Sequence, residues 1–417
     1  MYQQLVEHIQ NELAVLRSPV KDEELQAKVT HYLLNPNHAY GLSDNDKSAI
    51  NQFVNEFCSQ QKITFDQIKN EFIRYAQERE HFKFIDLFAG IGGFNLALTS
   101  QGGKAVFSSE WDKSAKITYF NNYGKTPFGD INQFTAQGVS NEFIETMIPD
   151  HDVLAGGFPC QPFSHAGVSA RSALGLAHGF DCETQGTLFH SIARIAFVKQ
   201  PKIVFMENVK NIVSHNNGET FSVIKETMEN LGQEAEGKQS YRFYYKLVNS
   251  ETLVAQRRVR CFMVCVREDV FQEFGAFKFP EFEGEPIPLR DALEELTAEL
   301  MEEYTISDRL WEGHINRTQR NLDRGTGFTA HVADLNRPSN TIVARYGKDG
   351  KECLIPQDGR NPRKLTIKEC ANLFGYPENF WVPSSKTPAY KQFGNSVVVP
   401  VVSRISSEIV QQYGLNQ

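Results

Sequence analysis

Between Phe82 and Val266 the sequence alternates short apolar runs with amphipathic segments. The runs FKFIDLF, KAVFSSE, DVLAGG and PKIVFMEN have the length and apolar content of buried strands. Segments such as GTLFHSIARIAFVKQ and TFSVIKETMENLG carry apolar residues at helical spacing. This alternation predicts one doubly wound α/β domain built on a largely parallel sheet.

Cys160 stands in a loop that the sequence makes stiff. It lies within DVLAGGFPCQPFS, where Pro159 and Pro162 bracket it. Each proline restricts its own φ and lacks an N–H, so neither a helix nor a central strand continues here. In an open α/β sheet, ligands bind at the carboxyl ends of the strands. The sequence therefore predicts a thiol held at a ligand-binding edge, which favours a nucleophile over a packed core cysteine.

A glycine-rich turn after the first strand indicates a ligand that approaches the backbone closely. Gly90, Gly92 and Gly93 permit such a turn. A dinucleotide-binding fingerprint would have glycine at position 95, where this chain has Asn95. Glu110 ends the next strand, close to the spacing at which an acidic residue meets ribose hydroxyls. The pattern favours S-adenosylmethionine over NAD as a nucleoside-containing cofactor.

Further residues at successive strand ends support the same cofactor. Trp111 offers a flat face for an adenine ring, although a partly buried structural aromatic is the alternative for this residue alone. Asp130 and Ile131 follow Gly129 after another short segment and could hold the adenine edge. Together with the glycine turn and Glu110, they predict a nucleoside pocket.

A carboxylate and two arginines follow later strands. Glu207 comes directly after the apolar run IVFM, where burying its charge is costly unless it serves a site. A salt-bridged structural glutamate is the alternative. In QRRVR, Arg258 and Arg260 alternate along a strand and share one face. Two adjacent guanidiniums repel each other unless they meet anions or carbonyl groups, and a solvated basic face is the alternative.

The overall charge does not indicate a nucleic-acid partner. The 417 residues carry a formal net charge of −8, so a nucleic-acid interface has to come from a local patch. Such a patch is predicted in the turn-rich segment 309–348, and an ordinary solvated charge run is the alternative. Its basic residues are Arg309, Arg317, Arg320, Arg324, Arg337, Arg345 and Lys348.

The seven cysteines and the apolar runs exclude other classes of protein. The cysteine count is odd and no CxxC pair occurs, which argues against a disulfide framework or a metal site. Cys261 and Cys265 lie in the strand-like run CFMVC and are predicted to be core residues. The first residues do not resemble a signal peptide, and no apolar run is long enough to cross a membrane, so we expect a cytoplasmic protein.

The two ends of the chain are predicted to be helical. Residues before about Glu80 show helical spacing without recognisable chemistry. They form either a helical extension packed on the main domain or a DNA-contacting regulatory module. Near the other end, Thr366 is expected to cap a helix, and Pro400 is expected in the first turn of an apolar helix.

Ordered blocks of this chain resemble DNA (cytosine-5) methyltransferases, in particular the bacterial Dcm-like enzymes. The blocks are FIDLFAGIGGF, SEWD, GDI, GFPCQPFS, GTLF, MENVKN, QRRVR, RKLTIKECANLFGYP and QFGNSVVVPV. The resemblance implies a Rossmann-like S-adenosylmethionine-dependent methyltransferase domain, a smaller target-recognition domain and an N-terminal helical extension. The expected parts are the extension 1–81, the catalytic domain 82–270, the target-recognition domain 271–362 and a returning segment 363–417.

The resemblance also implies roles for single residues. Cys160 would be the nucleophile, Glu207 would protonate N3 of the target cytosine, and Arg258 and Arg260 would support the loop and the base. The cofactor pocket would comprise Phe88, Gly90, Ile91, Gly92, Glu110, Trp111, Asp130, Ile131, Leu188, Asn395 and Ser396. The expected DNA contacts are Gln161, Ser164, Thr341, Ile342 and Arg345. One departure is Gln185, where many members have arginine before the glycine.

The implied activity is methylation of cytosine C5 in double-stranded DNA, with the target base flipped out of the duplex. We expect a monomer that acts on a short site, either as a solitary methylase or beside a cognate restriction endonuclease. Two alternatives stay open: the RNA-methylating branch of the same family, and a DNA-binding regulator that acts through the N-terminal segment. A catalytically dead structural protein is disfavoured because Cys160, Glu207 and Arg260 are all present.

Overall fold

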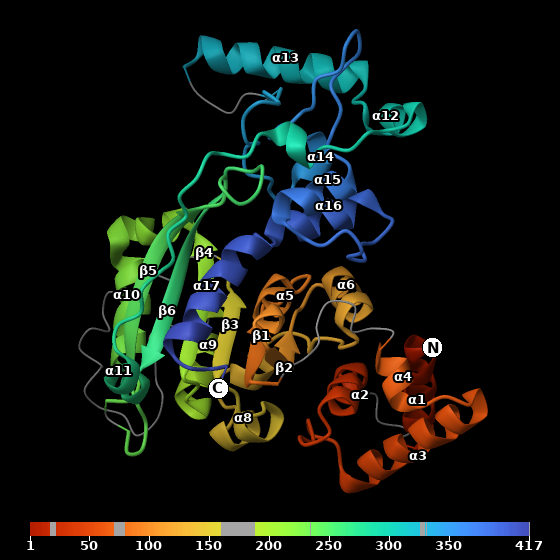
Figure 1. Ribbon diagram of the computed structural model, residues 1–417, viewed down its shortest axis with the longest axis vertical. Coiled ribbons are helices and arrows are strands. Elements are labelled where there is room, and N and C mark those ends of the chain that lie inside the picture. Colours follow the sequence, from red (N-terminus) through yellow and green to blue (C-terminus); the bar gives the residue numbers. More distant parts are fainter. Residues whose placement is uncertain are drawn as a thin grey trace. The chain divides into compact units, whose positions relative to one another are not determined.

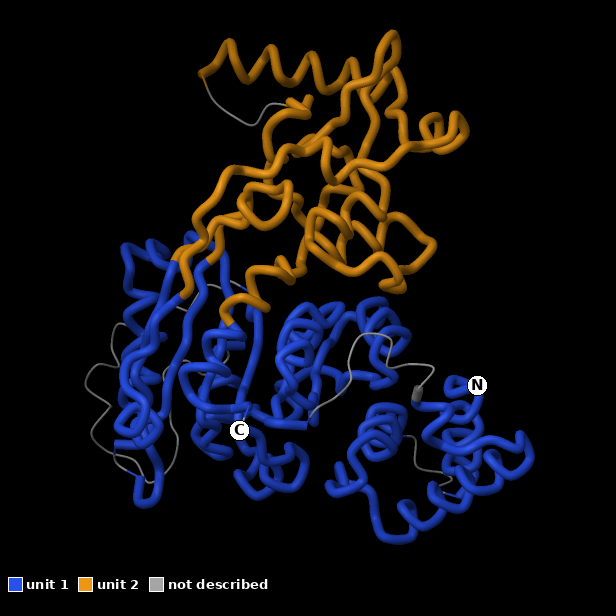
Figure 2. The backbone as a smooth tube through the Cα atoms, in the orientation of Figure 1, with its two compact units in different colours: residues 1–246, 261–279, 406–417 blue, residues 247–260, 280–405 orange. Residues whose placement is uncertain are grey.

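The computed structural model describes residues 1–16, 22–70, 80–159, 188–233, 235–325, 330 and 332–416. The backbone forms two compact units (Figure 2). Unit 1 comprises residues 1–246, 261–279 and 406–417, and unit 2 comprises residues 247–260 and 280–405. The division expected from the sequence, at residues 81, 270 and 362, stays a prediction. In the described part of the chain, no helix is both long and apolar enough to span a membrane.

A six-stranded sheet is the framework of unit 1 (Figure 1). Its strand order is β2-β1-β3-β4-β6-β5. The strands are β1 (Phe82–Leu87), β2 (Gly103–Ser109), β3 (Val153–Gly157), β4 (Ile203–Val209), β5 (Tyr241–Asn249) and β6 (Val259–Arg267). Strand β1 pairs in parallel with β2 and β3, and β3 pairs in parallel with β4. The predicted α/β fold with a largely parallel sheet is confirmed.

Helices alternate with these strands, because each apolar run is followed by a segment with one apolar face. The helices of this part are α5 (Gly93–Ser100), α6 (Lys113–Tyr123), α7 (Asn132–Thr135), α8 (Asn141–Met147), α9 (Leu188–Lys199), η3 (Lys210–Val213), η4 (His215–Gly218), α10 (Glu219–Asn230) and α11 (Glu268–Phe274). All seven residues of β2 are buried. Since β1 to β4 run parallel, the segments after Leu87, Ser109, Gly157 and Glu207 emerge at one edge of the sheet.

The N-terminal helices belong to unit 1. They are α1 (Tyr2–Leu16), α2 (Leu25–Leu34), α3 (Asp44–Gln61) and α4 (Phe65–Asn70). A capping box between Ser43 and Asp46 begins α3. Their buried residues Leu5, Ile9 and Val29 lie in the same hydrophobic core as Phe107 of β2. The segment is therefore packed into the core of unit 1.

Unit 2 is built mainly of short helices and connecting loops. They are η5 (Leu289–Ala292), α12 (Ala298–Tyr304), α13 (Asp308–Asp323), α14 (Tyr346–Asp349), α15 (Ile367–Phe374), α16 (Lys386–Asn395) and the first part of α17 (Val399–Gln412). Thr366 caps α15 as predicted, in a capping box with Glu369, whose carboxylate also pairs with Arg363 at 2.7 Å. Pro400 is the second residue of α17, which confirms its predicted place in the first turn.

Candidate active site

The glycine-rich turn between β1 and α5 has the conformation of a ligand-binding loop. Phe88, Gly90 and Gly92 have φ angles of 54°, 54° and 84°. A Cβ on Gly92 would lie 2.2 Å from a ring carbon of Tyr123, so a side chain is excluded there. A Cβ on Gly90 would meet no atom of the described residues within 4 Å. The left-handed conformation of Phe88, a bulky residue, is a strain of the kind found at functional sites.

Glu110 closes this turn from the next strand end. Its Oε2 accepts a hydrogen bond from the Gly90 N–H at 2.8 Å, and its Oε1 accepts one from the Asp112 N–H at 2.8 Å. The residue is 9% exposed, and burial raises the pKa of its carboxyl group. The Trp111 N–H also interacts with this carboxylate. A carboxylate has about four acceptor sites, so these contacts leave acceptor capacity for a ligand hydroxyl. The structure thus joins two predicted cofactor residues that are 20 positions apart.

Asp86 lies beneath the turn and was not predicted as a site residue. It is fully buried at the end of β1, and its Oδ2 accepts from the Tyr119 hydroxyl at 3.5 Å. Burial, and then the charge of Glu110, raise the pKa of Asp86 well above its usual value. Asn95, found where a dinucleotide fingerprint has glycine, donates to the Tyr119 hydroxyl at 2.6 Å and accepts from Thr99. Its amide therefore belongs to a polar network below the turn.

The other predicted cofactor residues of unit 1 lie beside Glu110. Trp111 is 79% exposed, so the alternative of a partly buried structural aromatic is wrong for this residue. The Glu110 N–H donates to Phe128 O at 2.8 Å, which fastens the segment before Asp130 and Ile131 to the end of β2. Asp130 is exposed and Ile131 is buried. Leu188 and Ile91 lie at the start of α9 and in the glycine turn, respectively.

These residues fit a nucleoside-containing ligand. The space at Gly90 is open, the Glu110 carboxylate has spare acceptor sites, and the Trp111 indole is free to stack on a flat ring. The three features come from neighbouring strand ends at the edge where open α/β sheets bind ligands.

Glu207 stands opposite the strand that leads to Cys160. It is 8% exposed and is the register partner of Gly157 in β3. The next residue, Asn208, is buried and donates from Nδ2 to Phe158 O at 2.9 Å. Sequence reasoning missed Asn208, although a buried amide after a glutamate at a strand end signals a polar contact. Cys160, Gln161 and Ser164 lie outside the described residues.

The cysteines that the structure describes are not suited to nucleophilic attack. Burial raises the pKa of the Cys261 and Cys353 thiols to about 12, and it also raises the pKa of Cys58, Cys265 and Cys370. Cys261 and Cys265 are fully buried, which confirms their predicted place in the core. Each of these thiols is therefore held in its protonated form near neutral pH, in which it is a poor nucleophile.

Arg258 organises a second set of predicted residues, all within unit 2. It is 4% exposed. Its Nη1 donates to Ile342 O at 2.9 Å, and its Nη2 donates to Gly394 O at 3.1 Å and to Ser396 O at 2.8 Å. Its guanidinium also lies 5.1 Å from the centre of the Phe374 ring. For Arg258 the alternative of a solvated basic face is wrong, and its observed contacts are those of a positioning residue.

Neighbours of Arg258 fasten the same segments. The Thr341 hydroxyl donates to Arg257 O at 2.7 Å, and the Ile342 N–H donates to Gln256 Oε1 at 2.9 Å. Gln256, which was not predicted as a site residue, is fully buried. Arg260 is half-buried and donates to Val259 O at 2.9 Å.

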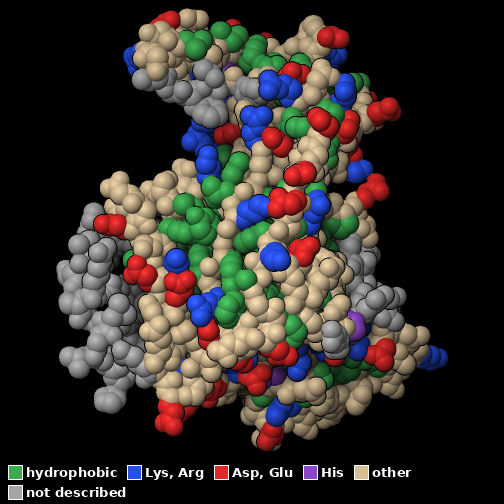
Figure 3. All heavy atoms as spheres, turned by 60° about the vertical axis from the view of Figure 1, so that its left-hand side comes forward, with side chains coloured by type: hydrophobic (Ala, Val, Ile, Leu, Met, Phe, Trp, Pro, Cys, Tyr) green, Lys and Arg blue, Asp and Glu red, His purple; other side chains and the backbone are tan. Residues whose placement is uncertain are grey.

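The remaining predicted residues of unit 2 differ in exposure. Asn395 and Arg345 are exposed, and Ser396 is buried with its hydroxyl 2.7 Å from that of Tyr376. The seven basic residues of the segment 309–348 are all exposed. Lys or Arg and Asp or Glu side chains lie side by side in the upper part of Figure 3. One described example is Arg317, whose Nη1 lies 3.7 Å from Asp349. The DNA contacts stay a prediction.

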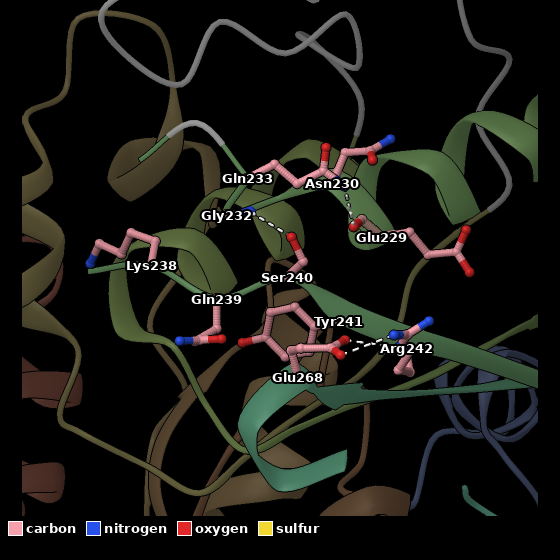
Figure 4. Close-up of a pocket in the computed structure, with 10 residues that line it drawn as sticks. All are labelled: Glu229, Asn230, Gly232, Gln233, Lys238, Gln239, Ser240, Tyr241, Arg242 and Glu268. Carbon is pink, nitrogen blue, oxygen red and sulfur yellow. Dashed lines mark hydrogen bonds and ion pairs between the residues drawn. The ribbon is translucent and has the colours of Figure 1, made fainter. Parts of the chain in front are cut away.

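A polar hollow of about 630 Å³ lies at a different place in unit 1 (Figure 4). It is lined by Glu229, Asn230, Gly232, Gln233, Lys238, Gln239, Ser240, Tyr241, Arg242 and Glu268. The Glu268 N–H donates to Ser240 O, and the Arg267 N–H donates to Lys202 O, just before β4 begins. The hollow therefore lies at the edge of the sheet opposite Glu207, and it is not part of the candidate site.

Comparison with known proteins gives one consistent family. The model of the family described as C-5 cytosine-specific DNA methylase matches residues 82–411. The type II methyltransferase M.SsoII of Shigella sonnei is 43% identical over 337 residues, covering 80% of this chain and 81% of its own. The type II methyltransferase M1.ScrFI of Lactococcus lactis subsp. cremoris is 38% identical, covering 94% of each chain. The DNA-cytosine methyltransferase of Escherichia coli K12 is 38% identical, covering 78% of this chain and 76% of its own.

Solved structures share the fold at lower identity. The Dnmt2 methyltransferase of S. pombe superposes with a TM-score of 0.55 at 18% identity, covering 79% of this chain and 98% of its own. A DNMT2 mutant of Spodoptera frugiperda gives a TM-score of 0.57 at 17% identity, covering 80% of this chain and 99% of its own. These likenesses support the Rossmann-like fold.

Proposed function

The chain belongs to the C-5 cytosine-specific DNA methylase family and is a DNA (cytosine-5) methyltransferase, and from that premise we propose how its residues carry out the reaction. Its substrate is cytosine in double-stranded DNA, and its methyl donor is S-adenosylmethionine. One observation carries the assignment: Glu207 is paired in register with Gly157, and Asn208 holds Phe158, two residues before Cys160. This pairing supports a nucleophile and a proton donor acting at one base.

The first chemical step is attack by the Cys160 thiolate on C6 of the cytosine ring. Cytosine C5 is a poor nucleophile, so the ring has to be activated before C5 can accept a methyl group. A bond forms between Sγ and C6, and Glu207 donates a proton to N3 as the ring electrons shift. The product is an enamine whose C5 is nucleophilic. After methylation a base removes the C5 proton, the thiolate is eliminated, and the N3 proton returns to Glu207, so both Cys160 and Glu207 are restored.

The residues of the glycine turn would hold the cofactor. When bound, S-adenosylmethionine supplies an electrophilic methyl group. Glu110 is suited to accept hydrogen bonds from ribose hydroxyls, and Trp111 is suited to stack on the adenine. Asp130 and Ile131 would meet the adenine edge, and the turn Phe88–Gly92 would approach the rest of the molecule.

The target cytosine has to leave the double helix before this chemistry can occur. C6 of a stacked base cannot be reached by a protein thiol, so the nucleotide is flipped out. Glu207 is 8% exposed, which supports a site that shields the flipped base from water. In unit 2, Arg258 holds the Thr341–Ile342 segment through Ile342 O, and this segment is a proposed DNA contact.

The biological setting that we propose is modification of a short DNA sequence. Relatives named type II methyltransferases support a place in a restriction-modification system, with a cognate endonuclease acting on the same site. A solitary methylase would perform the same chemistry.

A labelled-methyl assay tests the proposal directly. The protein is incubated with tritium-methyl S-adenosylmethionine and either plasmid DNA or tRNA, and bisulfite sequencing of the plasmid then identifies the modified cytosines. We expect label in the DNA alone and none with Cys160→Ser. Label in tRNA alone would instead establish the RNA-methylating alternative. Full activity of Cys160→Ser would contradict the covalent mechanism.

A further inference from the structure

The residue that precedes helix α2 of the N-terminal segment contacts the chain just before the proposed cofactor residues Asp130 and Ile131. Glu24, the residue before α2, accepts a hydrogen bond from the Gly129 N–H, at 3.0 Å from Oε1 and 3.1 Å from Oε2. Gln133 Nε2 donates to the same carboxylate at 3.2 Å, and Lys116 Nζ lies 3.9 Å from it. Gly129 directly precedes Asp130 and Ile131 of the proposed pocket.

Glu24 lies so close to Gly129 that a side chain at position 129 would have to displace the Glu24 carboxylate. A Cβ at this position would lie 2.5 Å from Glu24 Oε1, and its next nearest atoms would be at 3.6 and 3.7 Å. The φ angle of Gly129 is not in the left-handed region, so the backbone alone does not demand glycine. Among the described residues, the side chain of Glu24 is therefore the nearest obstacle to a methyl group at this position.

His31 of α2 holds strand β2, which directly precedes Glu110. It is fully buried, and its Nε2 accepts from the Ser108 N–H at 3.1 Å. A backbone N–H can only donate, so Nδ1 carries the ring proton and donates to Ala27 O at 2.9 Å. Ser108 O in turn accepts from the Phe128 N–H at 2.8 Å. His31 thus supports both β2 and the segment that leads to Gly129.

Further contacts from the N-terminal helices hold the same region. Thr30 Oγ1 accepts from the Thr126 N–H at 2.9 Å, and the Tyr2 hydroxyl donates to Gly124 O at 2.8 Å. The Tyr40 hydroxyl donates to Val106 O of β2. Strand β2 is the last in the sheet order, so its outer backbone groups would otherwise lack strand partners. The N-terminal segment supplies partners for this edge and for the loop beside it.

We propose that Glu24 and His31 are positioning residues for the cofactor pocket. They hold the segment Thr126–Ile131 and the end of β2 in the arrangement in which Asp130, Ile131 and Glu110 meet the cofactor. A loop that is already ordered loses less conformational entropy when a ligand binds, so affinity for the cofactor rises. The inference rests on the proposed cofactor site, and it gives the segment before Phe82, which lies outside the family match, a role in the reaction.

Substitutions of Glu24 test the proposal in the full-length protein. Dissociation constants for S-adenosylhomocysteine are measured by calorimetry, and KM values for S-adenosylmethionine and for DNA are measured separately. We expect Glu24→Ala to weaken cofactor binding about tenfold, with the KM for DNA and kcat changed less than about twofold. Glu24→Gln keeps an acceptor for Gly129 and should restore most of the affinity. Glu23→Gln is the matched control, because the neighbouring Glu23 is exposed.

Gly129→Ala tests the same contact from the other side. The new methyl group would displace the Glu24 carboxylate, so this variant should lose affinity about as much as Glu24→Ala. The double variant Glu24→Ala/Gly129→Ala should bind no more weakly than either single variant, since both remove the same contact. Independent, additive losses in the double variant would contradict a shared mechanism.

The possible failures can be told apart. Wild-type protein that binds S-adenosylhomocysteine, together with a Glu24→Ala variant that binds it equally well, would overturn this inference alone. If Glu24→Ala raised the KM for DNA as much as the KM for the cofactor and also lowered the thermal stability, its role would be generally structural. This result would also overturn the inference. Wild-type protein that binds no S-adenosylhomocysteine would overturn the proposed function, and this inference with it.

Discussion

The Nη2 atom of Arg258 lies 2.8 Å from the carbonyl oxygen of Ser396, to which it donates a hydrogen bond. The same side chain donates to Gly394 O and to Ile342 O. One buried guanidinium thus joins a proposed cofactor segment to a proposed DNA-contacting segment. Because three carbonyl groups share one cation, removal of the cation leaves all three without this donor.

Arg258→Ala is expected to reduce methyl transfer by at least about tenfold, since the loss of hydrogen bonds from a charged donor costs about 1.5–3 kcal/mol each. Arg258→Lys should recover little, because an ammonium group cannot reproduce the planar fork. Arg360→Ala is the control, since its side chain is 55% exposed and pairs with Glu302 at the surface. Steady-state kinetics and thermal unfolding measure both effects. An Arg258→Ala variant with the kinetics of the control would contradict the positioning role.

Glu110→Ala is expected to weaken binding of S-adenosylhomocysteine by about ten- to a hundredfold. The substitution removes the acceptor of the Gly90 and Asp112 N–H groups and also the proposed acceptor of the ribose hydroxyls. Glu110→Gln keeps one acceptor oxygen, so its affinity for S-adenosylhomocysteine should lie between those of the wild type and of Glu110→Ala. Calorimetry measures the affinities, with the exposed Glu145→Gln as the control. Unchanged affinity of Glu110→Ala would exclude this residue from the pocket.

Asn208→Ala is expected to lower kcat by about tenfold or more while cofactor affinity stays within about twofold. The side chain holds Phe158 O near the proposed nucleophile, so its loss should affect the covalent step and leave the glycine turn intact. Single-turnover kinetics on DNA measure this step, and the exposed Asn211→Ala is the control. A loss confined to cofactor binding would contradict the assignment.

Stability should fall as the pH is lowered from about 6.5. Burial lowers the pKa of His31 to about 3, from an ordinary value of 6.5. The unfolded chain therefore binds a proton that the folded protein excludes, and stability is full above pH 6.5 and is lost toward pH 3. At pH 4.5 this excluded proton lowers the free energy of unfolding by about 3 kcal/mol. Burial also lowers the pKa of His151, to about 4, so His151 too makes the protein less stable as the pH falls.

Urea unfolding of wild type and of His31→Gln at pH 7.5 and 4.5 isolates this effect. The variant should lose less free energy of unfolding than wild type between the two pH values. The comparison cancels the contribution of Asp86, whose raised pKa has the opposite sign. Equal pH dependence of the two proteins would show that His31 does not titrate in this way.

Local features of this protein followed from short stretches of sequence. The parallel strands were predictable because each apolar run is compact and ends in glycine or a polar residue. The Thr366 cap was predictable because a capping box spans only three residues. The glycine turn with Glu110 was predictable because a strand–turn–helix unit limits where the next strand can end. Resemblance to a family then supplied the roles of these residues.

The sequence by itself determined the α/β sheet, the glycine turn, the helix cap and the residue types available for chemistry. Only the tertiary structure decided that Arg258 meets Ser396, 138 residues away, and that Glu24 meets Gly129, 105 residues away. The physical reason is that backbone periodicity and caps depend on neighbours within a few residues, whereas a buried charged group takes whichever donors or acceptors the packed chain brings to it.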